Sequence, residues 1–339
     1  MPATRARALV LGDLVLDVVL APAGPLRRGT DVTGRVSFRQ GGSAATTARW
    51  LARLGTDATL VTAVGDDGLG DALVAHLESV GVTVHALRIR GARTGRLGVL
   101  VEEDAERSFV ADRGAIHRLS PRSLDPRWFG GLDLLHLPAY SLVGDTLAAA
   151  AARAARLARR GGARVSIDLA SAGFLAAEGP ARILGRVAQI GPDVLLATHA
   201  EAEAAVQGDP PAGLLRLAPL VVVKEGAHGA AVYVRGVPEP LSVPTLPAVA
   251  RDTTGAGDAF DAGFLAAWIR LSHGTKARGA AGPDRPGRDR PATMTVREGD
   301  LRRAVVAGHR AAARELLGRR TEFDMAGLLV HRAGRRPPR

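Results

Sequence analysis

The stretch Asp252-Thr253-Thr254-Gly255-Ala256-Gly257-Asp258-Ala259-Phe260 joins a strand-like segment, 241–249, to an apolar segment of helix length, 259–271. A turn of small residues that opens a helix exposes backbone N–H groups, and the helix dipole adds positive potential there. Such a turn favours a bound anion, and Gly255 and Gly257 allow a close approach of the backbone to a ligand. The spacing alone is equally compatible with an ordinary helix start that is capped by Asp.

Two carboxylates flank this turn. A site that only binds phosphate gains nothing from them, because their charge repels the ligand. A phosphoryl-transfer site does use a carboxylate, as the base for the attacking hydroxyl. The stretch therefore predicts Asp258 as a catalytic base, with Gly255, Ala256 and Gly257 holding the developing phosphate charge.

The composition limits the classes of protein to which the chain can belong. With 339 residues, of which 46% are hydrophobic, the chain can bury the core of one large domain or of two modest ones. It has no cysteine, which excludes disulfides, thiolate metal sites and cysteine nucleophiles. The net charge is +11, yet aromatic residues are only 4% and scattered. Basic clusters with interleaved aromatics are typical of nucleic-acid binding, so we predict no nucleic-acid partner.

The N-terminal apolar run is short. Residues 8–11 follow two arginines and end at Gly12, which is too short for a signal peptide or a membrane span. The rest of the sequence also lacks a stretch of about 18 uncharged apolar residues. We therefore expect a cytoplasmic protein without a membrane partner.

Strands and helices alternate along most of the chain. A buried strand is predicted at 8–11, and further strands follow at 132–137, 164–167, 194–197 and 220–223, separated by Ala-rich helices. This alternation predicts an α/β fold with a parallel sheet and helices on both faces. Polar side chains and one glycine follow the strand ends, where open α/β sheets bind ligands; they are Asp17, Asp168, Thr198, Glu201, Lys224 and Gly226.

A second glycine turn, Gly41-Gly42-Ser43, leads into a predicted helix at 44–54. The segments 18–40 and 94–111 alternate apolar and polar residues, which predicts short strands with one exposed face and a second, smaller sheet. Arg113 follows these strands as either a pocket residue or a surface arginine. The segment 273–292 is rich in Gly, Pro and Arg and is predicted as an exposed insertion, and 331–339 as a basic tail.

The segments 41–55 and 252–264 resemble the two signatures of the ribokinase-like carbohydrate kinase family, also called the PfkB family. Gly12 with Asp17, Glu201, and the segment 224–229 match the family in the same order, over roughly residues 8–320. The resemblance implies a Rossmann-like three-layer α/β/α domain at 1–330 with a mostly parallel central sheet. It also implies a small β-sheet lid from 15–40 and 94–113, whose strands often pair across a homodimer.

The resemblance further implies ATP-dependent phosphorylation of a hydroxymethyl group on a neutral sugar or nucleoside. Asp258 matches the base, and the N–H groups of 255–257 match the anion hole. The remaining matches are implied by position. The acceptor-binding residues are Asp17, Gly41, Gly42, Ser43, Thr46 and Arg113. The nucleotide-binding residues are Thr198, Lys224, Gly226, Gly229 and Thr253. Glu201 matches a residue that organises Mg²⁺ through water, and Asp252, with Thr253, lies where some members bind a monovalent cation such as K⁺.

The chain departs from the family pattern at several positions. Thr46 and Thr198 replace asparagines, and Ser43 stands where ribokinases have lysine. The segment 168–172 lacks the arginine of members that phosphorylate sugar acids, which argues against an anionic sugar acid as acceptor. The threonines motivate an alternative, a non-catalytic sugar or nucleotide sensor on the same fold. A dinucleotide-dependent oxidoreductase is disfavoured, because no Gly-x-Gly-x-x-Gly turn follows the first strand.

Overall fold

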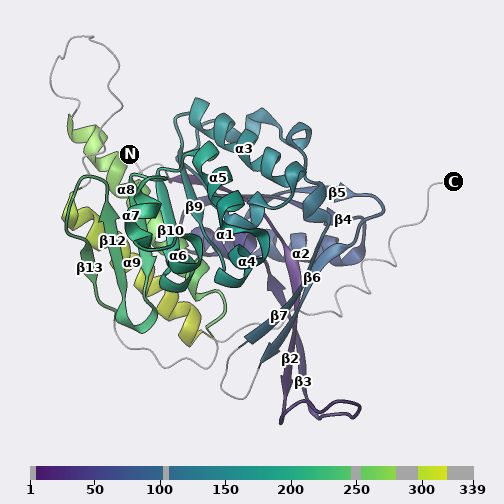
Figure 1. Ribbon diagram of the computed structural model, residues 1–339. Helices are drawn as coiled ribbons and strands as arrows, with labels where there is room; N and C mark the ends of the chain where they lie inside the picture. The colour runs from purple at the N-terminus through teal and green to yellow at the C-terminus, as the bar shows by residue number, and fades with distance from the viewer. Residues whose placement is uncertain (1–4, 102–106, 246–252, 280–296, 319–339) are drawn as a thin grey trace.

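A large sheet forms the frame of the protein. The computed structural model describes residues 5–101, 107–245, 253–279 and 297–318 (Figure 1). In spatial order the sheet is β13-β12-β11-β10-β9-β8-β1-β4-β5. Its strands are β1 (Arg7–Leu11), β4 (Asp57–Gly65), β5 (Thr83–Ile89), β8 (Leu134–Pro138), β9 (Arg164–Asp168), β10 (Val194–Thr198), β11 (Leu220–Lys224), β12 (Ala230–Val234) and β13 (Leu241–Val243).

Neighbouring strands from β11 to β5 run parallel. At one edge β12 pairs antiparallel with both β11 and β13. Parallel strands are buried on both faces, so their sequences are continuous apolar runs instead of alternating ones. In β1, Ala8 and Val10 pack into one core, whereas Leu9 and Leu11 pack into another. The predicted mostly parallel sheet is confirmed.

Helices cover both faces of this sheet. One core lies under α1 (Ser43–Arg53), α2 (Gly68–Ser79), α8 (Ala256–Gly279) and α9 (Glu298–Leu317). The other lies under α3 (Asp145–Arg160), α4 (Ala172–Glu178), α5 (Pro180–Ile190), α6 (His199–Ala205) and α7 (Pro210–Leu215). The 3-10 turns are η1 (Ala115–Arg118), η2 (Pro121–Ser123), η3 (Pro126–Phe129), η4 (Ala139–Leu142) and η5 (Gly226–His228). The chain thus has the predicted three-layer α/β/α architecture.

A second, smaller sheet projects from this body, as Figure 1 shows. Its order is β3-β2-β6-β7, from β2 (Val15–Pro22), β3 (Gly34–Gly41), β6 (Thr94–Val101) and β7 (Arg107–Gly114). The two central strands, β2 and β6, pair parallel, and the outer pairs are antiparallel. The prediction of a separate small sheet is confirmed; we call it the lid sheet below.

Helix α8 is longer than the sequence predicts. It runs to Gly279, so the predicted insertion at 273–292 begins inside this helix. The exposure of the insertion stays a prediction. Gly274 costs a helix only about 1 kcal/mol relative to alanine, and the first proline after it is Pro283. The remainder of the predicted insertion, 280–292, and the predicted tail, 331–339, lie outside the described residues.

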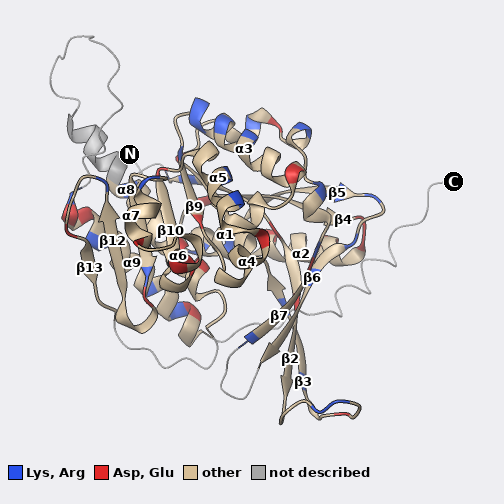
Figure 2. Cartoon of the chain, in the orientation of Figure 1, with Lys and Arg blue, Asp and Glu red and all other residues tan. Residues whose placement is uncertain are grey.

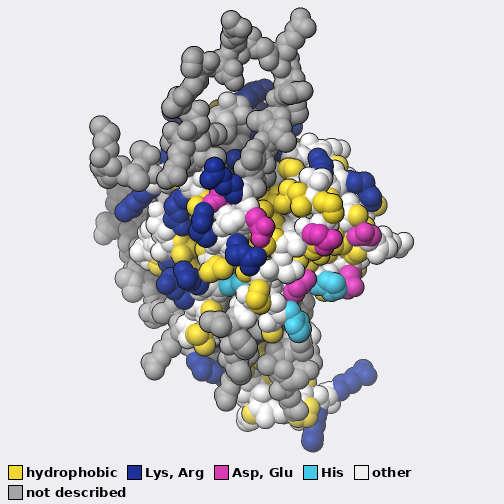
Figure 3. All heavy atoms as spheres, turned by 90° about the vertical axis from the view of Figure 1, so that its left-hand side faces the viewer, with side chains coloured by type: hydrophobic (Ala, Val, Ile, Leu, Met, Phe, Trp, Pro, Cys, Tyr) yellow, Lys and Arg dark blue, Asp and Glu magenta, His cyan; other side chains and the backbone are white. Residues whose placement is uncertain are grey.

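Charged residues are spread over the outer helices and turns (Figure 2). On the face that carries β12, β13 and α9, basic side chains stand among acidic and hydrophobic ones (Figure 3). Among the residues that the structure describes, no helix is long and apolar enough to cross a membrane. The cytoplasmic location stays a prediction.

Asp67 connects the large sheet to the lid sheet. Its carboxylate caps α2 by accepting from the Gly70 N–H at 2.9 Å. It also accepts from the backbone N–H of Thr94 at 2.8 Å and from the Thr94 hydroxyl at 2.6 Å, where β6 begins. Burial works to raise the pKa of Asp67, but the bonds from Thr94 and Gly70 outweigh it and hold that pKa below its usual range.

Replacing Asp67 by alanine should lower the free energy of unfolding by about 2 kcal/mol, because a cap and two further hydrogen bonds are lost. Since the folded-state pKa is depressed, this stabilisation is present above about pH 3.9 and is lost as the pH falls through the folded value. Urea unfolding at pH 7 and at pH 3 measures both effects. The exposed neighbour Asp66→Ala is the control and should change stability by less than about 0.5 kcal/mol; equal losses in the two variants would contradict the capping role.

Candidate active site

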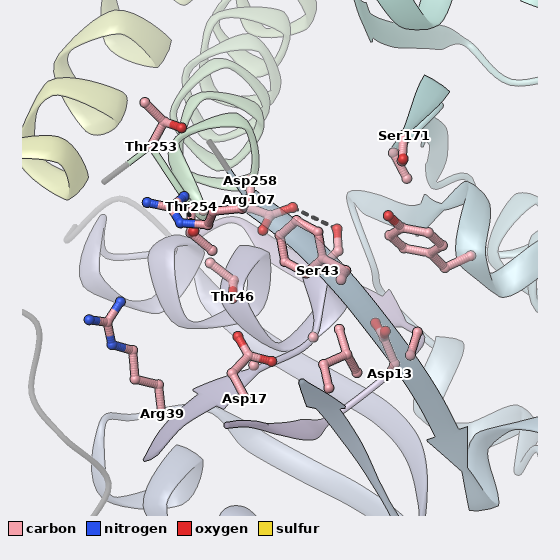
Figure 4. Close-up of a pocket in the computed structure, with 18 of the residues that line it drawn as sticks. Asp13, Asp17, Arg39, Ser43, Thr46, Arg107, Ser171, Thr253, Thr254 and Asp258 are labelled. Atoms are coloured by element: carbon pink, nitrogen blue, oxygen red, sulfur yellow. Dashed lines mark hydrogen bonds between the residues drawn. The ribbon is translucent and has the colours of Figure 1, made fainter. Parts of the chain in front are cut away.

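A cavity of about 1120 Å³ lies between the lid sheet and the carboxyl edge of the large sheet (Figure 4). It brings together most of the residues that the sequence singles out. These are Asp17, Gly41, Gly42, Ser43, Thr46, Arg113, Thr198, Glu201, Thr253, Gly255 and Asp258. They come from both signatures, from the lid sheet and from the end of β10, so the fold gathers distant segments at one place.

Asp258 lies in the first turn of α8, with its side chain partly buried. The Ser43 hydroxyl, at the start of α1, donates to Asp258 Oδ1 at 2.6 Å (Figure 4). Burial raises the pKa of Asp258 to about 8; Asp168 adds to the rise, whereas the Ser43 bond and the Lys224 charge oppose it. The group therefore changes protonation close to neutral pH.

The turn before Asp258 depends on glycine. Gly255 has φ +75°, which most side chains disfavour, and a Cβ there would lie 3.4 Å from both Glu315 Oε1 and Thr46 Cγ2. The Ala256 N–H donates to Thr253 O at 3.2 Å, so one of the three predicted anion-hole donors is engaged in the turn. The helix N-terminus faces the cavity with its positive potential.

The first signature meets this turn from the opposite side. Gly42 precedes α1 with φ +97°, and a Cβ there would lie 2.4 Å from Asp13 O. A Cβ on Gly41 would lie 2.0 Å from Asp17 Oδ1, so the carboxylate of Asp17 packs directly against bare backbone. These two glycines let the lid strands approach α1 closely enough to close the cavity.

Arg113 lines the cavity, and its positive charge is paired with a buried carboxylate. Its guanidinium pairs with Asp13 Oδ2 at 2.5 Å and lies 3.7 Å from the centre of the Tyr140 ring. Asp13 is 3% exposed. Sequence reasoning missed Asp13 and Tyr140, although the position of Asp13 directly after the first strand, beside Gly12, was an available signal.

Two lid arginines were also missed. Arg107, at the start of β7, donates to the Thr254 hydroxyl and so bridges the lid sheet to the glycine turn across 147 residues of sequence. Arg39 stands opposite Asp17 in the register of β2 and β3, and both line the cavity. No local sequence pattern predicts that either arginine lines the cavity, because both positions depend on contacts between segments that are distant in the sequence.

Thr198 and Glu201 form a capping box at the start of α6. Glu201 Oε2 accepts from the Thr198 N–H at 2.7 Å, and the Glu201 N–H donates to the Thr198 hydroxyl at 3.2 Å. Burial and Asp168 raise the pKa of Glu201. In the described part of the chain no three His, Cys, Asp or Glu side chains gather as a metal site. Glu201 can therefore contribute a single carboxylate to a cation whose other ligands come from substrate and water.

Other predicted residues do not line the cavity: Lys224, Gly226, Gly229, Ala256 and Gly257. Lys224 is buried against Asp168 and Asp261. A Cβ on Gly229 would lie 2.3 Å from Val243 O, which gives this glycine a packing reason of its own. Asp252 falls outside the described residues.

The loop after β9 carries a backbone outlier at the cavity wall. Ala170 has φ +69°, the only positive value among the described non-glycine residues. Its N–H donates to Asp168 Oδ2 at 3.0 Å, and both Ala170 and Ser171 line the cavity. Strained non-glycine residues cluster at functional sites, and this one shapes the wall opposite the lid.

This cavity at a sheet edge, with a carboxylate at a helix start that follows a glycine turn, fits an enzyme of the phosphotransferase class. Comparison with known proteins gives the family: the profile of the pfkB family carbohydrate kinases matches residues 5–317. The chain belongs to this family. It is a phosphotransferase that acts on an alcohol group, in a kinase family that uses ATP.

Similar proteins agree with this assignment. The chain is 34% identical to an ATP-dependent ribose-1-phosphate kinase from Halopiger xanaduensis, over 78% of this chain and 85% of that protein. The structure of adenosine kinase from Sinorhizobium meliloti superposes with a TM-score of 0.75 at 21% identity, covering 97% and 99% of the two chains. An E. coli structure in complex with ATP and Mg²⁺ gives a TM-score of 0.71 at 19% identity, covering 97% and 98%. The family and fold predictions are confirmed, and the sensor hypothesis is set aside because the chain is a kinase.

Replacing Ser43 by alanine should raise the pKa of Asp258 above its value of about 8, because the Ser43 hydrogen bond lowers it. Carboxyl ¹³C NMR over a pH titration measures this pKa directly, and the ascending limb of kcat/KM should move to higher pH with it. Ser123→Ala, in η2, serves as the control and should leave both unchanged. An unmoved Asp258 titration in the Ser43 variant would contradict the electrostatic role of this bond.

Proposed function

We propose that the protein transfers the γ-phosphoryl group of ATP to a hydroxymethyl group of a sugar or nucleoside, with Asp258 as the general base. The observation that carries the proposal is the placement of Asp258. Its carboxyl lies at the positive end of α8, is bonded to Ser43, and faces a cavity that Asp17 and two glycine turns also line. A carboxylate at such a place serves proton transfer better than anion binding.

In the proposed reaction Asp258 takes the proton of the acceptor hydroxyl. The acceptor oxygen then forms a bond to the γ-phosphorus, the bond from that phosphorus to the β-phosphate oxygen breaks, and ADP leaves with the electron pair. A base works best when its pKa lies near the working pH. The pKa of about 8 that burial gives Asp258 meets this condition.

Charge on the transferred group would be held by the N–H groups of Gly255 and Gly257 and by the dipole of α8. The Ala256 N–H, the third predicted donor, is engaged by Thr253 O in the turn. Arg107 supports this proposal from the lid, since its guanidinium contacts Thr254 next to the turn (Figure 4). Phosphoryl transfer spreads charge over the equatorial oxygens, so donors on several sides of the group add to its stabilisation. Arg107 would then act only when the lid sheet is in place.

The acceptor would lie between the lid sheet and α1. Asp17 can accept hydrogen bonds from its hydroxyls, beside the backbone of Gly41 and Gly42. Ser43 and Thr46 line the same wall, and the Thr46 hydroxyl can both donate and accept one bond. Arg113, held by Asp13, forms a fixed side of this pocket.

The nucleotide would lie toward β10 and β11. Glu201 fits a role in holding Mg²⁺ through water, since its carboxylate lines the cavity; the ion, when bound, would neutralise charge on the phosphates. Thr198, Thr253, Gly226 and Gly229 remain proposed nucleotide contacts. A K⁺ ion near Asp252 and Thr253 stays a proposal as well.

A homodimer through the lid sheet also stays a proposal. It is supported by apolar side chains on β2, β3 and β7 that face solvent. The exposed fractions of Leu20, Val36 and Val110 are 39%, 59% and 78%. A second copy could cover them.

A second candidate is an acceptor that already carries a phosphate. It is supported by the arginines that line the cavity, which are Arg39, Arg49, Arg53, Arg107, Arg113 and Arg314. Arg113 is matched by Asp13, and Arg49 lies 3.7 Å from Glu315, so part of this charge is already neutralised. Arg39 is placed next to Asp17, where the acceptor would bind. The ribose-1-phosphate kinase at 34% identity supports the same candidate.

Replacing Asp258 by asparagine should lower kcat by about 10²–10⁴-fold, because general-base catalysis contributes that much. Asparagine keeps the shape and can still accept from Ser43, so nucleotide affinity should stay close to that of the unaltered protein. ADP release, measured over a panel of pentoses, hexoses, nucleosides and their phosphates, gives kcat, and calorimetry gives nucleotide affinity. Asp300→Asn, on the far end of α9, is the control. Full activity of the Asp258 variant would overturn the assignment of the base.

The two acceptor classes are separated by Arg39→Gln. If the acceptor carries a phosphate, this change should raise KM for ribose 1-phosphate by about tenfold or more, since a charge-assisted hydrogen bond is worth about 1.5–3 kcal/mol. KM for ribose or adenosine should stay unchanged in the same variant. Arg35→Gln, on the same strand but exposed, is the control. Equal effects on charged and neutral acceptors would exclude a phosphate contact of Arg39.

A further inference from the structure

Lys224 lies at the centre of a buried charge cluster below the cavity. From the end of β11, its Nζ donates to Asp168 Oδ1 at 2.7 Å, at the end of β9. The same ammonium donates to the Oδ1 and Oδ2 atoms of Asp261, on α8, at 3.0 and 3.3 Å. Lys224, Asp168 and Asp261 are 8%, 4% and 0% exposed. The ammonium therefore joins two strand ends to the helix that carries Asp258.

This ammonium lies directly behind the glycine turn. A Cβ built on Gly257 would be 3.6 Å from Lys224 Nζ, closer than any other atom outside the turn's neighbours. Asp261 follows Asp258 by three residues, so the two carboxyls lie on neighbouring positions of one helix face. Lys224 does not line the cavity, whereas Gly255 and Asp258 on the same turn do.

The two carboxylates offset the cost of burying the Lys224 ammonium. Burial works to lower the pKa of Lys224, but Asp168 and Asp261 outweigh it and raise that pKa, so the lysine stays charged. A buried ion pair of this kind adds little stability compared with apolar packing, whereas removal of one partner is strongly destabilising. Fold stability alone therefore does not account for a lysine at this position.

We propose that Lys224 is a positioning residue whose ammonium, fixed between Asp168 and Asp261, holds the first turn of α8 against the sheet and strengthens the positive potential behind Gly257. Through this turn it would orient Asp258 and the backbone donors toward the transferred phosphoryl group. The inference deepens the proposed function and rests on it. It gives Lys224 a role that differs from a direct contact with nucleotide phosphates.

The test compares Asp261→Asn with the double variant Lys224→Met/Asp261→Asn. The first keeps the ammonium and its pair with Asp168. The second removes the ammonium but leaves one carboxylate, that of Asp168, so the cluster keeps the net formal charge of the unaltered protein. Lys224→Met alone leaves two buried carboxylates without the ammonium, so the Tm of this variant should be well below the Tm of Asp261→Asn and of the double variant. Ile183→Ala, a buried position on α5, controls for lost stability.

We expect the double variant to have nearly the same Tm as Asp261→Asn. Its kcat should be lower than that of Asp261→Asn by up to about tenfold, with KM for ATP and acceptor unchanged. This loss is smaller than the loss of about 10²–10³-fold in kcat that follows removal of a direct oxyanion donor, because Lys224 acts through the turn. Its affinity for MgADP with aluminium fluoride, a mimic of the transferred group, should fall by a similar factor in calorimetry. Ile183→Ala should lower Tm without changing either value. Equal kcat and equal affinity in Asp261→Asn and the double variant would overturn the inference.

The two proposals fail in different measurements. If the unaltered protein releases no ADP with any acceptor of the panel, the proposed function fails. If that protein is active and the two Asp261 variants are equally active, only the role of Lys224 fails. The calorimetric comparison needs no acceptor, so it tests the ammonium even before the acceptor is known.

Discussion

The site depends on the meeting of two helix starts. α1 and α8 begin at glycine turns, and the Ser43 hydroxyl of one donates to the Asp258 carboxyl of the other at 2.6 Å. The contact requires positive φ values at Gly42 and Gly255, because only then do both helices begin beside each other without a side chain between them. Burial of Asp258 at this junction raises its pKa, so the packing of two helices sets the chemistry of one carboxyl. The cavity, the lid sheet and the strand ends are arranged around this contact.

Much of this arrangement could be predicted from local sequence. The alternation of strands and helices predicted the layered α/β fold, and the two glycine turns predicted where the cavity lies, because turn geometry and helix starts depend on neighbouring residues. The extent of α8 was misjudged because a glycine and a basic composition were taken as the end of a helix. The lid sheet was predicted as a small sheet, but its parallel pairing of β2 with β6 was not, since pairing joins segments far apart in the chain.

The contacts that tune the site could not be predicted in the same way. Asp13 and Arg113 are 100 residues apart, and Arg107 reaches Thr254 across 147. The family resemblance implied a place for Lys224 beside the nucleotide phosphates, but it did not predict that the side chain is buried against Asp168 and Asp261. A strand end fixes the position of a backbone atom, but the direction of a long side chain depends on which partners the fold brings near it. Such partners become visible only in three dimensions.

The lid sheet stands largely outside the two hydrophobic cores, and its outer side chains, such as Val36 and Val110, face solvent. Substitutions of these solvent-facing side chains therefore have little effect on the free energy of unfolding, although Arg39 and Arg107 on the same strands line the cavity. Asp258 and its supporting charges, by contrast, are fixed by α1, α8 and the large sheet. The fold thus separates two kinds of position: exposed lid-sheet positions that can be exchanged at small cost to the folding free energy, and Asp258, whose bond to Ser43 ties α8 to α1.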